Sequence, residues 1–306
     1  MTGELDVPFA SPGEFGRIAL AWLSEGAQAL AKDISDEILA GPPMKLPLDE
    51  VYTDEGPGTE WPPLWGEVRI EYPSRSGGHY YKPYGQTSLK RLDALAPLLE
   101  SADVILQRRS DDERPPDLYL QVHREGRESG YARLLIMLGD GADCTAGDPK
   151  IAFMRNFARR LAPGFGHVSP DARRLPGETQ LELALNLMLK DTFAGLERYL
   201  RGYSWITVVP AALAGRLGGV SALRGTGAFD EVAGLAGGSV WLQATPRWSD
   251  YVQPRRDRVF EVLAPVLPPG MPKATRLIRP AGRTLPEIRI PYVLSIRDAA
   301  ELHAGE

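Results

Sequence analysis

The sequence predicts an α+β fold, in which helices pack on a mixed, largely antiparallel sheet or on several such sheets. Segments with apolar residues at helical spacing alternate along the chain with short segments whose apolar and polar residues alternate at strand spacing. A weak internal repeat leaves open that the chain contains two related halves. The order of strand, polar turn, helix and Leu-Ala-Pro occurs at Arg133–Pro163 and again at Val240–Pro265.

The first expected element is an N-terminal helix. Ser11 is a candidate N-cap, Pro12 suits the first helical position, and Glu14 stands where a capping box places its acidic residue. A broad apolar stripe continues to Ile38, and Gly41-Pro42-Pro43 should end the helix. The segment from Pro42 to Pro63, rich in proline, glycine and acidic residues, reads as a long loop.

The middle of the chain predicts strands separated by a loop and a helix. Alternation at Glu67–Tyr72 indicates a strand with one face toward water, followed by a loop over Ser74–Gln86. Ser88 is the expected cap of a helix that extends to Leu99. Two further strands are expected at Leu118–His123 and Arg133–Leu138, the second nearly all apolar, as in a strand covered on both faces.

The second half predicts more helix. Asp148-Pro149 should start one helix, and a longer one is expected over Thr179–Leu200. Strands around Trp205 and Trp241 then precede a last helix. That helix contains Val259, Phe260 and Leu263, and an edge strand is expected through Ile288, Ile290 and Tyr292.

No sharp linker interrupts this series, so we expect one α+β unit over residues 1–306. It comprises an N-terminal helix and acidic loop at 1–63, an α+β core at 64–270, and a C-terminal strand and tail at 271–306.

Composition limits the class of protein. An apolar content of 43% and a charged content of 25% exclude wholesale disorder. A single cysteine, Cys144, cannot form an internal disulfide, and no signal peptide or membrane-spanning stretch is evident, so we expect a cytoplasmic protein. The net charge of −5 is uneven, because the first sixty residues carry twelve acidic and three basic side chains. This acidic region is either a solvated surface or a surface for a basic partner.

The sequence indicates no catalytic residue, no metal site and no cofactor. Gly139-Asp140-Gly141 lacks the third glycine of a dinucleotide fingerprint, and the four histidines are scattered. Asp148 and its neighbours Asp140 and Asp143 suit turns and helix caps better than a calcium loop. Cys144 has no base beside it in the sequence. We therefore expect a protein that is not an enzyme. A pI near 5.6 with only short basic runs also argues against nucleic-acid binding.

Two aromatic clusters lie in predicted loops, one at Trp61–Trp65 and one at His79–Tyr84. Large aromatic side chains on loops are typical anchors of protein interfaces, because they bury much area at low entropic cost. They could equally fold back over the core. Trp205 and Trp241, on predicted strands, are expected in the core.

One stretch carries a family resemblance. It runs through Gly202–Val209, Leu217-Gly218-Gly219, Ser239–Pro246 and Leu263-Ala264-Pro265. This order of a tryptophan-bearing strand, a Gly-Gly break, a second such strand and a helix resembles bacterial immunity proteins of the polymorphic-toxin and type VI secretion kind. The immunity protein 52 family is the nearest to it. The resemblance spans roughly residues 65–267, and it implies an α+β fold, no cofactor, cytoplasmic residence and one-to-one binding of a cognate toxin, often a nuclease.

The resemblance assigns no interface residue, so the binding surface is a hypothesis from the residues themselves. Acidic side chains would steer a basic toxin toward the surface and aromatic side chains would slow its dissociation. The expected partner-binding residues are Asp49, Glu50, Asp54, Glu55, Glu60, Trp61, Trp65, Tyr80, Tyr81 and Tyr84. The alternatives are a small-molecule enzyme with a site assembled only in three dimensions, and a scaffold protein of a secretion or phage-like particle. The oligomeric state is left open.

Overall fold

The computed structural model describes residues 2–42, 63–73, 78–108, 117–125, 130–138, 144–169, 179–273, 294–295 and 297–303. Contacts divide the chain into two compact units. Unit 1 contains residues 1–2 and 9–141, and unit 2 contains residues 3–8 and 142–306. That the chain folds as a single continuous unit stays a prediction.

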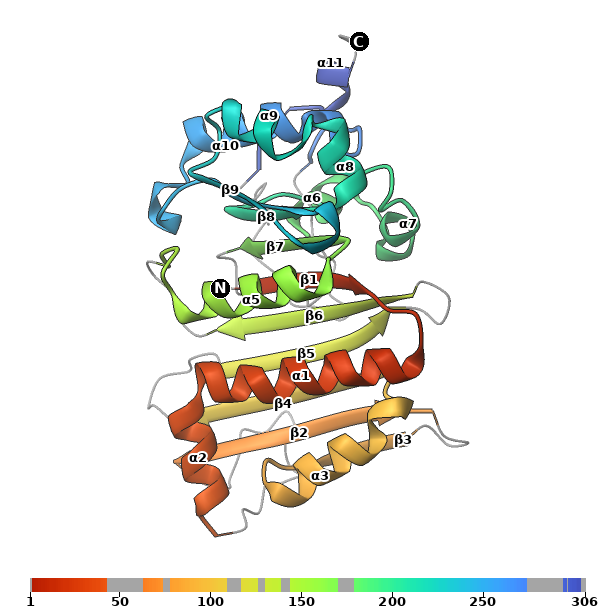
Figure 1. Ribbon diagram of the computed structural model, residues 1–306, viewed down its shortest axis with the longest axis vertical. Helices are drawn as coiled ribbons and strands as arrows, with labels where there is room; N and C mark the ends of the chain where they lie inside the picture. The colour runs from red at the N-terminus through yellow and green to blue at the C-terminus, as the bar shows by residue number, and fades with distance from the viewer. Residues whose placement is uncertain are drawn as a thin grey trace, which may run out of the picture. The chain divides into compact units, whose positions relative to one another are not determined.

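Unit 1 is a layer of helices on one face of an antiparallel sheet (Figure 1). Its strand order is β3-β2-β4-β5-β6. Its helices are α1 (Pro12–Leu30), α2 (Lys32–Ala40) and α3 (Gln86–Leu95), with a 3-10 turn η1 (Ala96–Leu98) after α3. Its strands are β2 (Leu64–Tyr72), β3 (Gly78–Pro83), β4 (Ser101–Arg108), β5 (Leu118–Glu125) and β6 (Tyr131–Leu138).

The start of α1 confirms the predicted cap. The Ser11 hydroxyl accepts the Glu14 N–H at 3.2 Å, and the Glu14 carboxylate accepts the Ala10 N–H at 2.7 Å. The expected single helix is wrong in one respect, because the backbone leaves helical geometry at Ala31 and α2 continues from there to Ala40. Gly41 ends α2, as predicted.

Alternation gives the sheet of unit 1 two different faces. The residues that face the helices are apolar and buried, as Val68, Val104 and Leu120 are in the register of β2, β4 and β5. The other face carries Glu67, Arg69 and their neighbours across the strands, which are polar in the middle of the sheet. The fold therefore separates a hydrophobic core from a polar sheet face.

Unit 2 has the strand order β1-β7-β8-β10-β9. Its strands are β1 (Thr2–Pro8), β7 (Phe165–Ser169), β8 (Ile206–Val209), β9 (Glu231–Gly234) and β10 (Val240–Gln243). Its helices are α5 (Pro149–Leu161), α6 (Gln180–Leu185), α7 (Leu189–Ala194), α8 (Ala211–Arg216), α9 (Gly219–Gly225), α10 (Gln253–Leu263) and α11 (Ala300–His303). The 3-10 turns are η2 (Ala236–Gly238), η3 (Trp248–Asp250) and η4 (Ala264–Val266).

The core of unit 2 contains the two tryptophans that the sequence assigns to it. Trp205 is 1% exposed, and its indole N–H donates to the Thr245 carbonyl at 2.8 Å. Trp241 has no exposed surface and lies on β10, which pairs antiparallel with both β8 and β9. The cap of α5 is also confirmed, because the Asp148 carboxylate accepts the Lys150 N–H at 2.9 Å.

The α+β class and the antiparallel pairing are confirmed, and several elements differ from expectation. The loop expected over Ser74–Gln86 contains strand β3. The long helix expected over Thr179–Leu200 is wrong, because Asn186 adopts a left-handed conformation that ends α6. Ser88 does not cap α3 but lies in its first turn, where its hydroxyl bonds the Gly85 backbone. The strands β1, β4, β7 and β9 were not expected. The predicted strand through Ile288, Ile290 and Tyr292 and the predicted turn at Gly139-Asp140-Gly141 lie outside the described residues.

Two of the Leu-Ala-Pro segments share a local structure. Leu95-Ala96-Pro97 and Leu263-Ala264-Pro265 each lead from the end of a helix into a 3-10 turn. Leu161-Ala162-Pro163 instead ends α5 with Ala162 in the left-handed region, at φ 46°.

Candidate functional site

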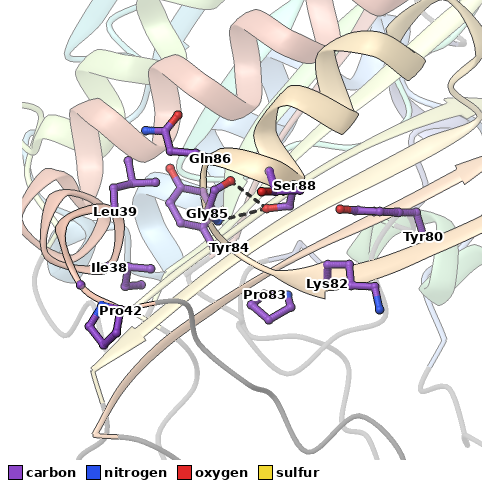
Figure 2. A pocket seen from close by; sticks show the side chains of 12 residues that line it. Ile38, Leu39, Pro42, Tyr80, Lys82, Pro83, Tyr84, Gly85, Gln86 and Ser88 are labelled. Atoms are coloured by element: carbon purple, nitrogen blue, oxygen red, sulfur yellow. Dashed lines mark hydrogen bonds between the residues drawn. The ribbon is translucent and has the colours of Figure 1, made fainter.

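A groove in unit 1 contains two of the aromatic residues that the sequence assigns to a binding surface. It is a cavity of about 560 Å³ between the end of α2, strand β3 and the start of α3. Figure 2 shows how the side chains from these three elements converge. The groove is lined by Ile38, Leu39, Gly41, Pro42, Tyr80, Lys82, Pro83, Tyr84, Gly85, Gln86, Thr87 and Ser88.

Strand alternation directs Tyr80 and Lys82 to the same side of β3. In the register with β2 they lie opposite Ile70 and Val68, whose side chains belong to the helix-covered face. Tyr80 is half-buried, and burial raises the pKa of its phenol. Its ring therefore presents an apolar body with a neutral hydroxyl to the groove.

Tyr84 is the fixed part of the groove. It is 4% exposed, its N–H donates to the Gly66 carbonyl at 2.7 Å, and its hydroxyl lies 2.9 Å from the Ser35 hydroxyl on α2. Burial raises the pKa of the Tyr84 phenol. Because Tyr84 directly follows β3 and its hydroxyl contacts Ser35 on α2, its side chain is held in one position at the wall of the groove.

Charges of both signs act at the groove, because Asp36 on α2 acts on the Tyr84 phenol while the charged lining residue is a lysine. Lys82 is the charged residue among the described lining residues, and its side chain is exposed. Helix α3 begins at the groove, and its first turn contains no acidic residue to offset the positive end of the helix dipole. Arg91 adds its charge near the Tyr80 hydroxyl. A ligand that brings a carboxylate to Lys82 would therefore meet favourable electrostatics there.

The two other expected binding residues that the structure describes, Tyr81 and Trp65, do not line the groove. Tyr81 lies on the opposite face of β3, where its hydroxyl donates to the Glu67 carboxylate and its ring lies 5.2 Å from the guanidinium carbon of Arg69. Trp65, on β2, is half-buried on that same polar face, opposite Gln107. Sequence reasoning did not separate these residues because it placed the tyrosines on a loop, where alternation is lost.

Six expected binding residues lie outside the described residues. They are Asp49, Glu50, Asp54, Glu55, Glu60 and Trp61.

The polar face of unit 1 holds a cluster of titratable groups. Burial raises the pKa of the Asp103 carboxyl to about 6, against the opposing effects of a Gln121 hydrogen bond and the Arg69 charge. Burial and the neighbouring Glu67 raise the pKa of Tyr81 to about 12. Burial also raises the pKa of Tyr119, whose hydroxyl accepts from Gln121 Nε2 at 3.0 Å. Such a group of shifted pKa values is the kind of arrangement that general acid–base chemistry uses.

Unit 2 has a buried charge cluster around Arg201, which sequence reasoning did not find. The guanidinium donates to Glu4 at 2.7 Å, to Asp6 at 2.5 Å, and to both oxygens of Glu182 at 2.8 and 3.0 Å. All four side chains are 2% exposed or less. His167 is also buried, and burial lowers its pKa. The acidic residues at positions 4 and 6 alternate as in a strand, which was the one available signal.

Cys144 and His123, two side chains that an enzyme site assembled in three dimensions could use, each lie near a carboxylate. Burial raises the pKa of the Cys144 thiol, whose sulfur lies 3.8 Å from an Asp148 oxygen. His123 Nε2 lies 4.0 Å from Glu125 Oε1, and burial lowers the His123 pKa. Within the described ranges, no cluster of three or more histidine, cysteine or acidic residues has metal-binding geometry.

Among the described helices, none combines the length and the apolar character needed to cross a bilayer.

Comparison with known proteins finds similarity in structure and none in sequence. No protein-family model and no curated protein matches the sequence. The fold is similar to that of a solved structure described as the Pseudomonas aeruginosa T6SS protein PA0821, with a TM-score of 0.56 and 14% identity. The alignment covers 98% of this chain and 80% of that one. The likeness therefore extends over both units, and at this identity it establishes the fold alone.

Proposed function

We propose that this protein is a bacterial immunity protein that binds and neutralises a cognate toxin by direct contact, with the groove of unit 1 as the docking site. The toxin is expected to be a nuclease of a type VI secretion or polymorphic-toxin system. The observation that carries this proposal is the groove, where half-buried Tyr80 and buried Tyr84 line a concave site beside the exposed Lys82. Aromatic side chains in a concave site are typical anchors of protein–protein interfaces.

The similar solved structure supports a role in type VI secretion. It is described as a type VI secretion system protein, and its likeness extends over almost the whole of this chain. The resemblance of the segments around Trp205 and Trp241 to immunity proteins supports the immunity function. Under this proposal the protein acts in the cytoplasm of the cell that it protects, and it needs no cofactor.

Binding at the groove would combine two contributions. A toxin side chain inserted between Tyr80 and the α2 residues Ile38 and Leu39 would bury apolar surface, which stabilises the complex by about 25 cal/mol per Å² removed from water. Lys82 would add electrostatic steering, which acts mainly on the association rate. The acidic stretch that contains Asp49 and Glu60 stays a prediction of a second contact, for a basic region of the toxin.

The test is a rescue assay. Each gene that flanks this one would be expressed from a tightly controlled promoter, with and without this protein, and surviving cells would be counted. We expect one neighbour to kill alone and to be harmless when co-expressed. A Tyr80→Ala variant should weaken the rescue, and a Tyr199→Ala variant, at an exposed tyrosine of unit 2, should not. If both neighbours are expressed and neither kills, the immunity function is wrong.

The titratable cluster of the polar face favours a second candidate function. A carboxyl with a pKa of about 6, such as that of Asp103, can donate and accept a proton near neutral pH, as a general acid or base must. The second candidate is therefore an acid–base enzyme for a small substrate. Wild-type protein and Asp103→Asn would be compared on chromogenic ester, phosphate and glycoside substrates. Turnover that the substitution abolishes would support this candidate, and equal background rates would dismiss it.

A further inference from the structure

The outer edge of β3 pairs with no other strand that the structure describes. β3 stands at the end of its strand order, and within the described chain it pairs only with β2. The Tyr84 N–H donates to the carbonyl of Gly66 directly opposite it, so the next pair along the ladder, Pro83–Glu67, is of the non-hydrogen-bonded type. Pairs alternate along an antiparallel ladder, and the Tyr81–Arg69 and His79–Glu71 pairs are therefore of this type as well.

This register fixes which groups face outward. Residues of non-hydrogen-bonded pairs direct their N–H and C=O away from the partner strand, so His79 and Tyr81 present both groups at the outer edge. Pro83 presents only its carbonyl, because proline has no N–H. The edge is thus a short row of two donors and three acceptors, and the His79 side chain beside it is 72% exposed.

The groove runs beside this edge. Tyr80 and Lys82, which line it, alternate with the residues whose backbone groups face outward (Figure 2). An open strand edge next to side-chain pockets is the arrangement by which proteins add a strand from a binding partner. Main-chain hydrogen bonds then supply affinity, and every second side chain of the added strand enters the pockets and supplies specificity.

We infer that the groove and the outer edge of β3 together bind an extended, acidic segment of the partner protein, which adds to the sheet of unit 1 as a sixth strand. This inference rests on the proposed function for the identity of the partner, the toxin. It goes further by assigning the binding mode and the chemistry of the bound segment.

Charge decides between the partner and a second copy of this chain. A second copy would bring another Lys82 to the same edge, whereas an acidic segment would neutralise Lys82 and meet the positive end of α3. Lysine and proline on an exposed edge are also residue types that discourage self-association. The bound segment should therefore carry one apolar side chain toward Tyr80 and one carboxylate, two residues away, toward Lys82.

The probe is a synthetic ten-residue peptide with threonine at odd positions and valine and glutamate alternating at even positions. Its matched control has lysine in place of glutamate. Titrations against the full-length protein are expected to give binding of the acidic peptide at least tenfold tighter than that of the lysine peptide. Lys82→Glu should reverse this preference, and Lys90→Glu, on the exposed side of α3, should leave it in place.

The backbone contribution is tested by His79→Pro with His79→Ala as its matched control. Proline removes an outward N–H and leaves the bonds to β2 intact, whereas alanine removes only the side chain. We expect about tenfold weaker peptide binding for the proline variant and no change for alanine, since one lost hydrogen bond to a fixed edge changes affinity by about this factor. Should His79→Pro misfold, amide exchange of His79 and Tyr81 in the wild-type protein replaces it, with protection expected when the acidic peptide binds.

Equal binding of both peptides, or of both His79 variants, would overturn the inference. A dimer that sedimentation detects and His79→Pro abolishes would overturn it in favour of a second copy. These results do not depend on the rescue assay. A toxin that is neutralised equally by wild type and His79→Pro would leave the proposed function in place and reject strand addition.

Discussion

Arg201 is the residue on which the charge balance of unit 2 depends. Its guanidinium forms ion pairs with Glu4, Asp6 and Glu182, and it lies 4.6 Å from the ring centre of Phe193. Among the described residues, these three carboxylates surround the Arg201 guanidinium, and each is 2% exposed or less. Removing that cation would leave buried like charges close together, which proteins avoid by protonation or unfolding.

Replacing Arg201 with methionine should therefore be severely destabilising. Loss of one partner from a buried ion pair typically costs about 3–5 kcal/mol. We expect a drop of this size in the free energy of unfolding, measured by urea denaturation at pH 7. The control is Arg198→Met, at an exposed position three residues earlier in the chain. Equal stability of the two variants would show that the cluster around Arg201 is not a stabilising centre.

Asp103 predicts a pH dependence of stability. Burial raises its pKa from 3.8 to about 6, so between these values the native state holds a proton that the unfolded state has released. Stability contributed by the protonated carboxyl is therefore present below pH 4 and is lost as the pH rises to about 6.

Replacing Asp103 with asparagine should remove this loss. A shift of one pKa unit corresponds to about 1.4 kcal/mol of folding free energy. We therefore expect Asp103→Asn to be more stable than wild type by about 1–3 kcal/mol at pH 7.5. At pH 4 the two proteins should be nearly equal in stability. Thermal unfolding at both pH values checks this. A wild type that is the more stable protein at pH 7.5 would contradict it and would indicate that the carboxylate is needed in its ionised form.

At the scale of elements, the packing of α1 on the turn after α3 depends on one glycine. A Cβ atom at Gly16 would lie 2.4 Å from the Ala96 carbonyl oxygen, which is backbone and has little room to move. Gly13, on the same helix, has no atom within 4 Å of its Cβ position. The two glycines thus differ in packing while sharing the same helix.

Gly16→Ala should destabilise the protein by about 1–3 kcal/mol, as overpacking of a tight contact does. Gly13→Ala should be neutral or stabilising by up to about 1 kcal/mol, since alanine is the better helix former. Chemical denaturation of both variants measures the difference. If both substitutions change stability equally, the close approach of α1 to Ala96 does not occur.

Elements with a strong local signal could be predicted from the sequence, and elements without one could not. The cap and the Gly41 end of the first helical region follow from residue types that act within one turn. Strand β3 was expected as a loop because Gly78 and Pro83 bound it and only the ladder with β2 makes it a strand. The break at Asn186 likewise depends on a backbone conformation that an apolar periodicity cannot reveal.

At the scale of the whole molecule, the N-terminal strand belongs with residues far along the chain. Glu4 and Asp6 on β1 pair with Arg201, and the Gly164 N–H donates to the Asp6 carbonyl at 2.8 Å. Leu5 and Val7 are fully buried. Unit 2 is thus built from two stretches separated by the whole of unit 1.

Deleting residues 2–8 should therefore destabilise unit 2 before unit 1. Hydrogen exchange is expected to lose protection in β7, at Phe165–Ser169, while β2 to β4 stay protected. The control is deletion of the last three residues, 304–306, which should change neither. Loss of protection in both units together would contradict two separable units, and would support the expectation of one continuous α+β unit.

The candidate site shows the same limit of sequence reasoning. Tyr80 and Tyr84 were predicted as binding residues because large aromatic side chains on loops are typical anchors of protein interfaces, and both line the groove. Tyr81 was grouped with them, but strand alternation turns it to the opposite face, beside Glu67. Lys82 and the open edge were missed, since an unpaired edge is a property of strand order and not of residue type.

The sequence by itself determined the α+β class, the helix caps and the burial of Trp205 and Trp241, because propensity, capping and apolar periodicity act over a few neighbouring residues. Only the tertiary structure decided the strand order, the pairing of Arg201 with Glu4 and Asp6, and the groove beside β3. The physical reason is separation along the chain. Contacts between residues nearly two hundred positions apart leave no periodic signal, and they exist only once the sheet has been assembled.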